Sequence, residues 1–239
     1  MEAVAAGGDP DDPEAAARVL EGLTFTLERM VARNERLQTT PPGEEEEEDE
    51  EEGESALMEA ERRRRRGLAF FKGTRAPGIS VGKYLERLRQ YTGCSAACFV
   101  VGFVYIDRAA HRHPGSLVLS LNVHRLVLTS LLIASKILDD SHHDNAFFAK
   151  VGGVSNAELN RMELELLFML DFRLVVTSRV FESYCWHLEK EKTMARVNPE
   201  KGIGVGVRDA SKLNGKVERL PNGASLRPSS SSPRLSMDF

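Results

Sequence analysis

The stretch NVHRLVLTSLLIASKILDD, residues 122–140, has the pattern of a buried helix. Apolar residues occupy most of its positions, and Asn122 is a residue type that commonly precedes the first turn of a helix. Lys136 interrupts the apolar run shortly before its end. On a helical wheel Lys136 shares a polar stripe with Arg125, which predicts a place at the helix edge, with the lysine stem buried and its ammonium group in water.

Segments with similar start and stop signals lie on both sides of this helix. Ser80 and Gly93 are suited to begin and end one helix, and Ser95 is suited to begin the next. That next segment, CFVVGFVYIDR, is apolar nearly all round, which predicts the central buried helix of the fold. Residues 155–158, SNAE, match a capping box at the start of a helix that runs to about Phe172. No segment shows the alternation expected of a strand, so the sequence predicts an all-α fold.

Composition divides the chain into a helical domain with flanking segments. Small, acidic and proline-containing residues at the N-terminus, and the Gly, Asn, Pro and Ser of the C-terminal region, are typical of disorder. Periodic apolar residues predict a separate helix near the N-terminus. The predicted boundaries are a disordered segment at 1–14, an N-terminal helix at 15–38, an acidic then basic low-complexity linker at 39–67, a helical domain at 68–191 whose last helix begins near Thr177, and a disordered tail at 192–239.

Charge is concentrated in two blocks of the linker. Residues 43–54 contain ten Asp and Glu residues, and residues 62–66 are five consecutive arginines. The whole chain has a formal net charge of −4, so the remainder is nearly neutral and has no broad basic surface. We therefore expect no nucleic-acid binding. The arginine run is compatible with a nuclear localisation signal, or with an electrostatic partner for the acidic block, and both interpretations stay open.

The sequence does not show the features of membrane or secreted proteins. The apolar runs 98–106 and 126–138 are shorter than the roughly 20 residues that a membrane-spanning helix needs. The N-terminus is acidic and shows no apolar signal-peptide core. Three cysteines do not suggest a disulfide framework, and we interpret Cys94 and Cys98 as small buried residues. We expect a soluble protein of the nucleus and/or the cytoplasm that does not bind membranes.

No motif in the sequence indicates catalysis or cofactor binding. GIGVGV at 202–207 does not lie between a strand and a helix, as a nucleotide-binding loop would. His142, His143 and Asp144 lack the regular spacing and the cysteines of a structural zinc site, and we interpret them as a solvated loop. There is no convincing catalytic triad or paired-carboxylate arrangement. We expect a protein that is not an enzyme and uses no cofactor, metal or small-molecule substrate.

A second charged residue lies among apolar residues in the helix that follows SNAE. Glu158, Arg161 and Glu165 share one side of this helix and are expected to face water. Glu163 lies within the apolar face, and an unpaired buried carboxylate costs several kcal/mol, so it requires a cationic or hydrogen-bonding partner. Two interpretations stay open. Either Glu163 pairs inside the domain while Lys136 extends to water, or the two meet at the rim and present charge to another protein.

Three stretches together resemble the cyclin box: YIDRAAHR (105–112), LTSLLIASKILDD (128–140) and FAKVGGVSNAELNRMELELLFMLDFRLVVT (148–177). The resemblance covers about residues 79–176, in the order and at the spacing of the family. Two further stretches resemble the plant P-type (U-type) cyclins, which are similar to the phosphate-signalling cyclins of fungi: VLEGLTFTLERMVARNE (19–35) and FFKGTRAPGISVGKYLERLRQYTGCSAACFVVGFVYIDR (70–108). The resemblance implies a single five-helix cyclin box with an N-terminal helix and an extra C-terminal helix.

The resemblance also implies a function. It suggests a regulatory, non-catalytic subunit that binds and activates a cyclin-dependent kinase of the A-type, in cell-cycle or nutrient-linked control of cell division. In the family, a lysine and a glutamate contact the kinase near its mobile C-helix, and the matching positions here are Lys136 and Glu163. Apolar candidates for the same interface are Leu132, Ile133, Phe147, Phe148 and Leu167. The alternative is a cyclin-fold adaptor in transcription that does not activate a kinase, which would need a basic face.

The sequence departs from the mitotic and G1 cyclins in one helix. SVGKYLERL (80–88) lacks their Met-Arg-rich motif, which forms a substrate-docking groove and supplies an arginine partner to the aspartate of YIDR. In the resemblance, Asp107 and Arg108 are structural residues of the box. Asp107 therefore needs another partner, and Lys83 or Arg87 is expected to serve.

Overall fold

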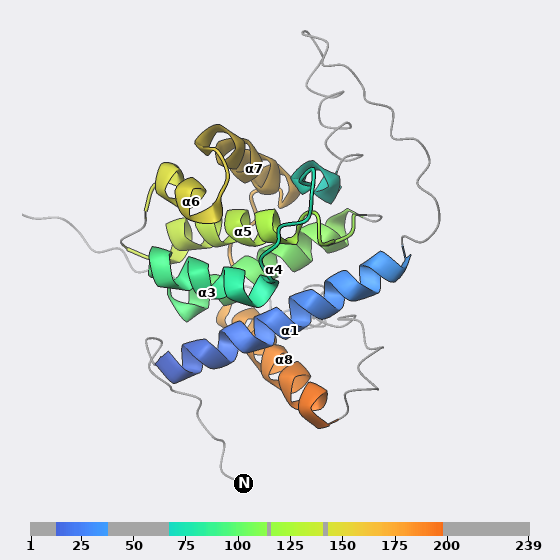
Figure 1. Ribbon diagram of the computed structural model, residues 1–239. Helices are drawn as coiled ribbons and strands as arrows, with labels where there is room; N and C mark the ends of the chain where they lie inside the picture. The colour runs from blue at the N-terminus through green and yellow to red at the C-terminus, as the bar shows by residue number, and fades with distance from the viewer. Residues whose placement is uncertain (1–12, 38–66, 114–115, 141–142, 198–239) are drawn as a thin grey trace, which may run out of the picture. The chain divides into compact units, whose positions relative to one another are not determined.

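The computed structural model describes residues 13–37, 67–113, 116–140 and 143–197, and their regular structure is entirely helical. The predicted all-α fold is confirmed, and no helix in these ranges is long and apolar enough to cross a bilayer. Most of the predicted linker and of the predicted tail lies outside the described residues. The elements are α1 (Pro13–Leu37), η1 (Gly67–Phe71), α3 (Val81–Thr92), α4 (Ala96–Arg112), α5 (Val123–Leu138), α6 (Asn145–Gly152), α7 (Asn156–Met169) and α8 (Ser178–Val197) (Figure 1).

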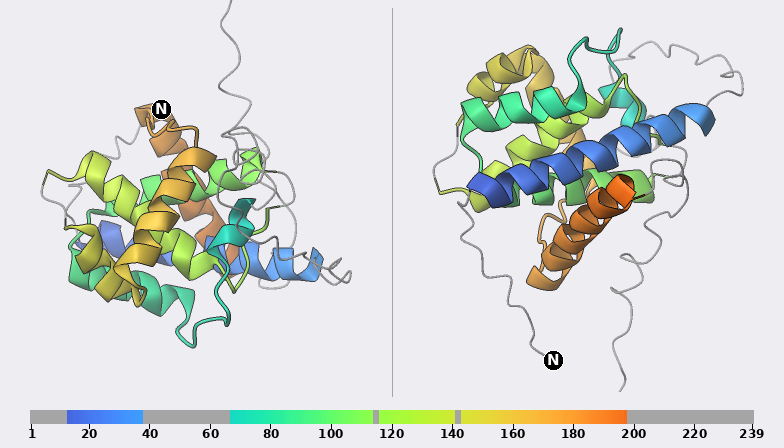
Figure 2. Two further views of the ribbon diagram at one scale, coloured as in Figure 1. Left: turned by 90° about the horizontal axis from the view of Figure 1, so that it is seen from above. Right: turned by 60° about the horizontal axis from the view of Figure 1, so that its bottom comes forward.

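Helices α4 and α5 form the centre of the domain. They pack against each other, while α3, α6 and α7 pack on α5 and α1 and α8 pack on α4 (Figures 1 and 2). The two backbones approach closely at Gly102, where a Cβ atom would lie 3.3 Å from Ser130 Oγ and 3.4 Å from the backbone nitrogen of Leu131. A larger side chain at this position would push α5 away from α4, so glycine sets the spacing of the central pair.

The helices α3 and α7 begin where the sequence predicts, at Ser80 and Ser155, whereas α6 lies in a stretch that was interpreted as a loop. Ser80, Asp144 and Ser155 each accept a hydrogen bond from a backbone N–H three residues further on, at the starts of α3, α6 and α7. Gly93 and Gly153 end α3 and α6 with φ angles of 66° and 76°, a conformation that glycine adopts without strain. These caps fix the short connections that bring α6 and α7 onto the same side of α5.

Asn122 stands at the N-cap position of α5, but its side chain makes no capping bond. Its Oδ1 accepts from the backbone N–H of Leu119 at 2.8 Å. Its Nδ2 donates to the carbonyl oxygens of Leu117 at 2.9 Å and Leu68 at 3.3 Å. The buried amide therefore joins η1 and the preceding loop to the start of α5, which is a tertiary role that the local sequence does not reveal.

The expectation for the water-facing side of α7 is wrong in part. Glu165 is buried, whereas Arg161 is exposed and Glu158 pairs with Arg125 of α5. The short helix η1 packs against α7, and the Arg161 guanidinium lies 6.0 Å from the centre of the Phe70 ring. No sequence pattern indicated η1.

Helix α1 packs on α3, α4 and α8 (Figure 2). A Cβ atom at Gly22 would lie 3.1 Å from the carbonyl oxygen of Leu188, so α1 and α8 are in backbone contact. Arg29 of α1 also forms an ion pair with Glu191 of α8. The N-terminal helix is therefore an integral part of the domain, joined to the helix at the other end of the described chain.

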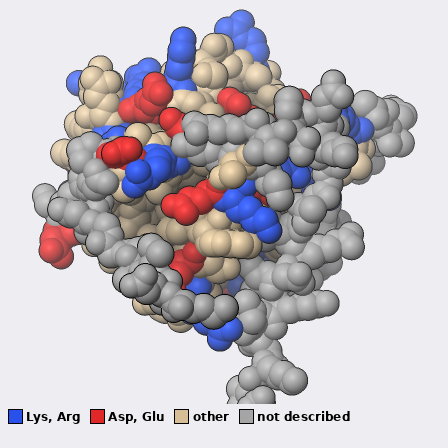
Figure 3. All heavy atoms as spheres, turned by 90° about the horizontal axis from the view of Figure 1, so that it is seen from below, with Lys and Arg blue, Asp and Glu red and all other residues tan. Residues whose placement is uncertain are grey.

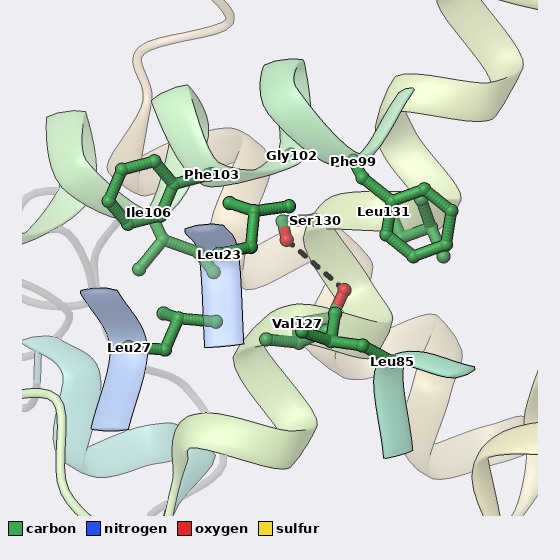
Figure 4. A pocket seen from close by; sticks show the side chains of 10 residues that line it. All are labelled: Leu23, Leu27, Leu85, Phe99, Gly102, Phe103, Ile106, Val127, Ser130 and Leu131. Atoms are coloured by element: carbon green, nitrogen blue, oxygen red, sulfur yellow. Dashed lines mark hydrogen bonds between the residues drawn. The ribbon is translucent and has the colours of Figure 1, made fainter. Parts of the chain in front are cut away.

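A small apolar pocket lies where α1 meets α3, α4 and α5 (Figure 4). The Ser130 hydroxyl in its wall is already satisfied, because it donates to the carbonyl oxygen of Val127 at 3.2 Å. The lining carries no charged side chain, so we interpret the pocket as a packing gap beneath α1 rather than a ligand site. It is lined by Leu23, Leu27, Leu85, Phe99, Gly102, Phe103, Ile106, Val127, Ser130 and Leu131.

Asp107 in α4 has partners other than the expected Lys83 or Arg87, which are exposed on α3. Tyr184 of α8 donates its hydroxyl to Asp107 Oδ2 at 2.6 Å, and His111 Nδ1 lies 3.3 Å from Oδ1. Burial and the charge of Asp107 raise the pKa of Tyr184 above its usual range, so the hydroxyl remains a donor. The buried carboxylate of Asp107 therefore joins α4 to α8, whereas the sequence had suggested a partner on α3.

Arginines of α4 hold the segment between α7 and α8. Arg108 donates to the carbonyl oxygens of Arg173 and Val175 at 3.1 and 3.2 Å. Arg112 donates to the carbonyl oxygen of Leu170 at 3.0 Å. These bonds satisfy carbonyl groups that follow the end of α7 and fix its last turn on the central helix.

The bond between Tyr184 and Asp107 gives a test of the α4–α8 connection. We expect Tyr184→Phe to lower the free energy of unfolding by about 1–3 kcal/mol, because it removes a donor from a buried carboxylate. Tyr91→Phe is the control, since Tyr91 is exposed and its change should stay within about 0.5 kcal/mol. Urea unfolding followed by circular dichroism measures both. Equal stability of the two variants would show that the carboxylate does not depend on Tyr184.

Candidate functional site

Lys136 and Glu163 meet at the surface where the last turn of α5 packs on α7. Lys136 Nζ donates to Glu163 Oε1 at 2.5 Å, and the exposed fractions of the two side chains are 32% and 16%. Glu163 therefore has the cationic partner that its apolar surroundings require. The pair is neither fully buried nor fully solvated. It joins α5 to α7 inside the domain, as one interpretation expected, and it also reaches the domain surface, as the other expected.

Asn145, the first residue of α6, holds the other oxygen of this carboxylate. Its Nδ2 donates to Glu163 Oε2 at 2.7 Å and to Asn160 Oδ1 at 2.7 Å. Asp144 fixes the start of α6 by accepting from the N–H of Phe147 at 2.8 Å, which places Asn145 beside α7. Sequence reasoning missed Asn145, because the contact joins residues far apart in the chain and no spacing rule indicates it.

The apolar residues expected around the pair divide into two groups. Leu132, Ile133 and Phe148 have exposed fractions of 0%, 2% and 0%, so they belong to the core and offer no surface to a partner in this structure. Phe147 and Leu167 are half-buried and do reach the surface. The Phe147 ring, at the start of α6, also stacks on the ring of His143, with centroids 4.0 Å apart. This contact holds the Phe147 side chain at the surface.

An apolar stripe that sequence reasoning did not select lies on α7 next to Glu163. It consists of Leu164, Phe168 and Phe172, whose exposed fractions are 48%, 43% and 56%. The spacing of four residues places Leu164 and Phe168 along one side of α7, and Phe172 lies in the turn after the last residue of that helix. The Phe168 and Phe172 rings pack edge to face at 5.3 Å. The sequence did contain a signal for the exposure of Leu164 and Phe168. On a helical wheel both lie opposite the core residue Leu166.

The backbone at the end of α7 places Phe172 in this stripe. Asp171 and Phe172 both have positive φ angles, 54° and 53°, which cost free energy for residues other than glycine. The Phe172 N–H donates to the carbonyl oxygen of Leu167 at 3.0 Å, and Arg112 lies 3.4 Å from the Asp171 carboxylate. Contacts with α4 thus hold a strained turn that keeps a phenylalanine at the surface.

Ile137 and Leu138, with exposed fractions of 54% and 45%, end α5 just beyond Lys136. Exposed apolar residues that gather around a partly buried ion pair are typical of a protein-binding surface. In the described part of the chain, no group of three or more His, Cys, Asp or Glu side chains is arranged to hold a metal ion. His142, which belonged to the loop considered for metal binding, lies outside the described residues. This face is therefore a candidate for contact with another protein.

Comparison with known proteins matches residues 17–174 to the family described as Cyclin. The chain belongs to the cyclin family. The matched residues begin within α1 and end at Leu174, just beyond α7. The family region therefore includes most of the N-terminal helix. As a cyclin, the chain has a regulatory role.

Relatives of this cyclin include plant cyclins of the P and U types. It is similar to Cyclin-U1-1 of Arabidopsis thaliana, with 56% identity over 196 residues that cover 78% of this chain and 84% of the relative. Cyclin-P1-1 of Oryza sativa subsp. japonica is 58% identical over 128 residues, which cover 52% of this chain and 48% of the rice protein. Cyclin-U2-1 of Arabidopsis thaliana is 36% identical over 187 residues, covering 76% of this chain and 72% of the relative. The sequence resemblance to plant P-type/U-type cyclins is confirmed.

The contact between Asn145 and Glu163 gives a test of how the pair is held. We expect Asn145→Ala to lower the free energy of unfolding by about 1 kcal/mol, and Asn145→Asp to lower it further because a second carboxylate would face Glu163. Asn156→Ala is a control at an exposed asparagine of α7. Urea unfolding at low and high salt measures the three variants. If Asn145→Asp is as stable as the wild type, Asn145 does not position the carboxylate.

Proposed function

We propose that this cyclin binds and activates a cyclin-dependent kinase of the A-type through the face defined by Lys136, Glu163 and the stripe Leu164, Phe168 and Phe172. The observation that carries the proposal is the partly exposed ion pair between α5 and α7. Family membership supports it, since the matching lysine and glutamate of related cyclins are expected at the kinase. The proposed role is regulatory and non-catalytic, in cell-cycle or nutrient-linked control, in the nucleus and/or the cytoplasm.

The proposed mechanism is a shift of a kinase equilibrium. A protein kinase is inactive while the glutamate of its C-helix cannot reach the strand lysine that holds the ATP phosphates. A partner that binds only the inward position of that helix increases the population of the active arrangement. A rigid helical face is suited to this task, because its caps and buried contacts are already formed before binding.

The charged and apolar parts of the face have different tasks in this proposal. The Lys136 ammonium has three N–H groups, and Glu163 accepts from one, so donors remain for carbonyl oxygens of a kinase loop. Such polar contacts fix register, while exposed Phe168 and Phe172 supply apolar area that contributes affinity. The buried Leu132 supports the helix from beneath and is not placed at the interface.

A charge exchange separates a role in folding from a role in binding. In the double variant Lys136→Glu/Glu163→Lys, the two side chains still attract, while Asn145 loses its carboxylate acceptor. We therefore expect the free energy of unfolding to fall by no more than the loss expected for Asn145→Ala, about 1 kcal/mol. The charges shown to the kinase are reversed, so we expect binding to weaken about 30-fold or more, as at an interface hot spot. Calorimetric titration with a purified A-type kinase measures affinity, and histone phosphorylation in the same samples measures activation.

The matched control is the other ion pair between the same two helices. Arg125 of α5 pairs with Glu158 of α7, and the exposed fractions of these side chains are 25% and 36%. Exchange of this pair should leave kinase affinity within about two-fold of the wild type. If the exchange of Lys136 and Glu163 also leaves affinity unchanged, their pair serves the fold alone and the kinase binds elsewhere. Loss of binding in both exchanges would instead indicate disturbed α5–α7 packing.

The apolar stripe gives an independent test of the same proposal. We expect Leu164→Ser and Phe168→Ser each to weaken kinase binding about ten-fold or more, because each removes apolar area that the complex would bury. The exposed Trp186 on α8, which packs on α1 and α4, provides the control variant Trp186→Ser. Gel filtration and thermal melting verify the fold of all three. Equal affinity of the α7 variants and the Trp186 variant would place the kinase on another face.

One further observation bears on the transcription-adaptor alternative. On the face shown in Figure 3, Lys and Arg side chains are interspersed with Asp and Glu rather than gathered into one basic patch. Mixed charge does not release counterions from nucleic acid in the way a basic surface does. This face therefore gives no support to a DNA-binding adaptor.

A further inference from the structure

His124 is a buried histidine in the first turn of α5. It is the second residue of that helix, and its exposed fraction is 9%. Its Nε2 atom lies 2.9 Å from the carbonyl oxygen of Ile79, the residue before Ser80, which caps α3. A carbonyl oxygen accepts and never donates, so Nε2 carries a hydrogen in this bond. The bond therefore joins the start of α5 to the start of α3.

The second ring nitrogen of His124, Nδ1, is buried and has no hydrogen-bond partner among the residues that the structure describes. Because Nε2 carries the hydrogen, Nδ1 of the neutral ring has only a lone pair. Protonation would place an N–H group and a positive charge at this buried atom, with no acceptor beside it, which costs free energy. The surroundings of Nδ1 therefore favour the neutral ring.

Tyr84 of α3 packs edge to face against His124, with the ring centroids 5.0 Å apart. The Tyr84 hydroxyl donates to the carbonyl oxygen of Gly152, the last residue of α6, at 3.1 Å. Burial raises the pKa of Tyr84 above its usual range, so this hydroxyl stays neutral. His124 therefore lies in a contact that α3, α5 and α6 share.

The charged side chains around this contact are mostly cations. Arg87 of α3 and Arg125, the next residue of α5, both act on Tyr84, where they oppose the rise of its pKa. Glu158 of α7 is engaged in the ion pair with Arg125. The other charged side chains of α3, of α6 and of the segment before α3 are exposed or half-buried: Lys72, Arg75, Lys83, Glu86, Arg89 and Lys150.

No carboxylate in the described ranges forms an ion pair with His124. In contrast, His111 and His187 lie 3.3 and 4.0 Å from carboxylate oxygens. At the end of α4, Arg112 and His113 contact carbonyl oxygens at the end of α7. A protonated His124 would therefore be a buried cation without an anionic partner, an arrangement that proteins avoid.

The position of His124 in its helix acts in the same direction. The start of an α-helix is the positive end of its dipole, so a cation at the second residue of α5 is unfavourable. Burial lowers the pKa of His124 below its usual range, although its bond to Ile79 opposes this effect. His124 is therefore neutral in the closed domain at neutral pH.

We propose that His124 is a proton-sensitive contact, which holds the start of α3 against α5 while its ring is neutral and releases it when the ring is protonated. Histidine in an unfolded or locally opened chain binds a proton near a pH of about 6.5, whereas the closed contact opposes this binding. The stabilisation by neutral His124 is thus complete above a pH of about 6.5 and is lost as the pH falls below this value. The proposal does not depend on the kinase.

A pH titration of the ring signals by NMR, in isotope-labelled full chain, tests the protonation directly. We expect the ring of His124 to titrate at a lower pH than free histidine, for which the pKa is about 6.5. The measurement uses the wild type alone, so it decides the protonation even if a variant fails to fold. Titration of His124 at or above the pH of free histidine would overturn the proposal.

Unfolding by urea at two pH values measures the contribution of His124 to stability. His124→Gln keeps an N–H group that can donate to Ile79 but removes the titrating ring. Between a pH of about 7.5 and one of about 5.5, the unfolding equilibrium constant should increase about three- to ten-fold more in the wild type than in His124→Gln. His143→Gln, at an exposed histidine, is the control and should behave as the wild type. The same pH dependence in the wild type and His124→Gln would contradict the proposal.

A shorter amide tests the hydrogen bond itself. The amide nitrogen of asparagine takes the place of Nδ1 rather than Nε2, so His124→Asn loses the donor to Ile79. We expect His124→Asn to have a lower urea midpoint than His124→Gln at neutral pH, because the Gln variant restores the bond. Equal midpoints would show that the bond to Ile79 does not hold the contact.

Hydrogen exchange locates the opening within the domain. The Tyr84 N–H donates to the carbonyl oxygen of Ser80 at the start of α3, and the Leu159 N–H makes the matching bond to Ser155 at the start of α7. Protection of the Tyr84 amide, corrected for the pH dependence of chemical exchange, should fall about ten-fold between a pH of about 7.5 and one of about 5.5. Protection of the Leu159 amide should fall much less. An equal fall at both amides would mean that acid loosens the whole domain, and the assignment to His124 would be wrong.

Discussion

The close packing of α4 on α5 is the constraint on which the rest of the structure depends. Gly102 allows the two backbones to approach, and most side chains of both helices are buried. Every other helix of the described chain packs on one of these two. The end of α5 is therefore held in place before any partner binds, and Lys136 projects from a turn whose preceding residues are immobilised by the core. A rigid support of this kind is what a recognition surface requires.

Buried polar groups join this central pair to the helices around it. Asp107 binds Tyr184 of α8, and Asn122 binds Leu68 of η1. Each of these bonds satisfies a group that would otherwise cost free energy in the interior. Such contacts favour one arrangement of the helices over others. An alternative packing would leave the same buried groups without partners, which costs free energy.

The sequence predicts those features that depend on neighbours in the chain. Helix starts at Ser80 and Ser155 follow from local capping rules, and the central position of α4 follows from its apolar composition. It does not predict features that depend on distant contacts. The partner of Asp107 is on α8, and the burial of Glu165 accompanies the packing of η1 on α7. The ion pair of Lys136 and Glu163 also joins residues far apart in the chain, so the sequence left it as one of two open interpretations.

The ion pair of Lys136 and Glu163 joins two helices and also reaches the surface. A partly buried pair gains Coulomb energy but loses hydration, so apolar residues of similar size would often stabilise the domain equally well. The stripe that begins with Leu164 keeps about half of its side-chain surface exposed. In the proposed function, a kinase would bury the stripe and use the hydrogen-bonding groups that the pair keeps at the surface.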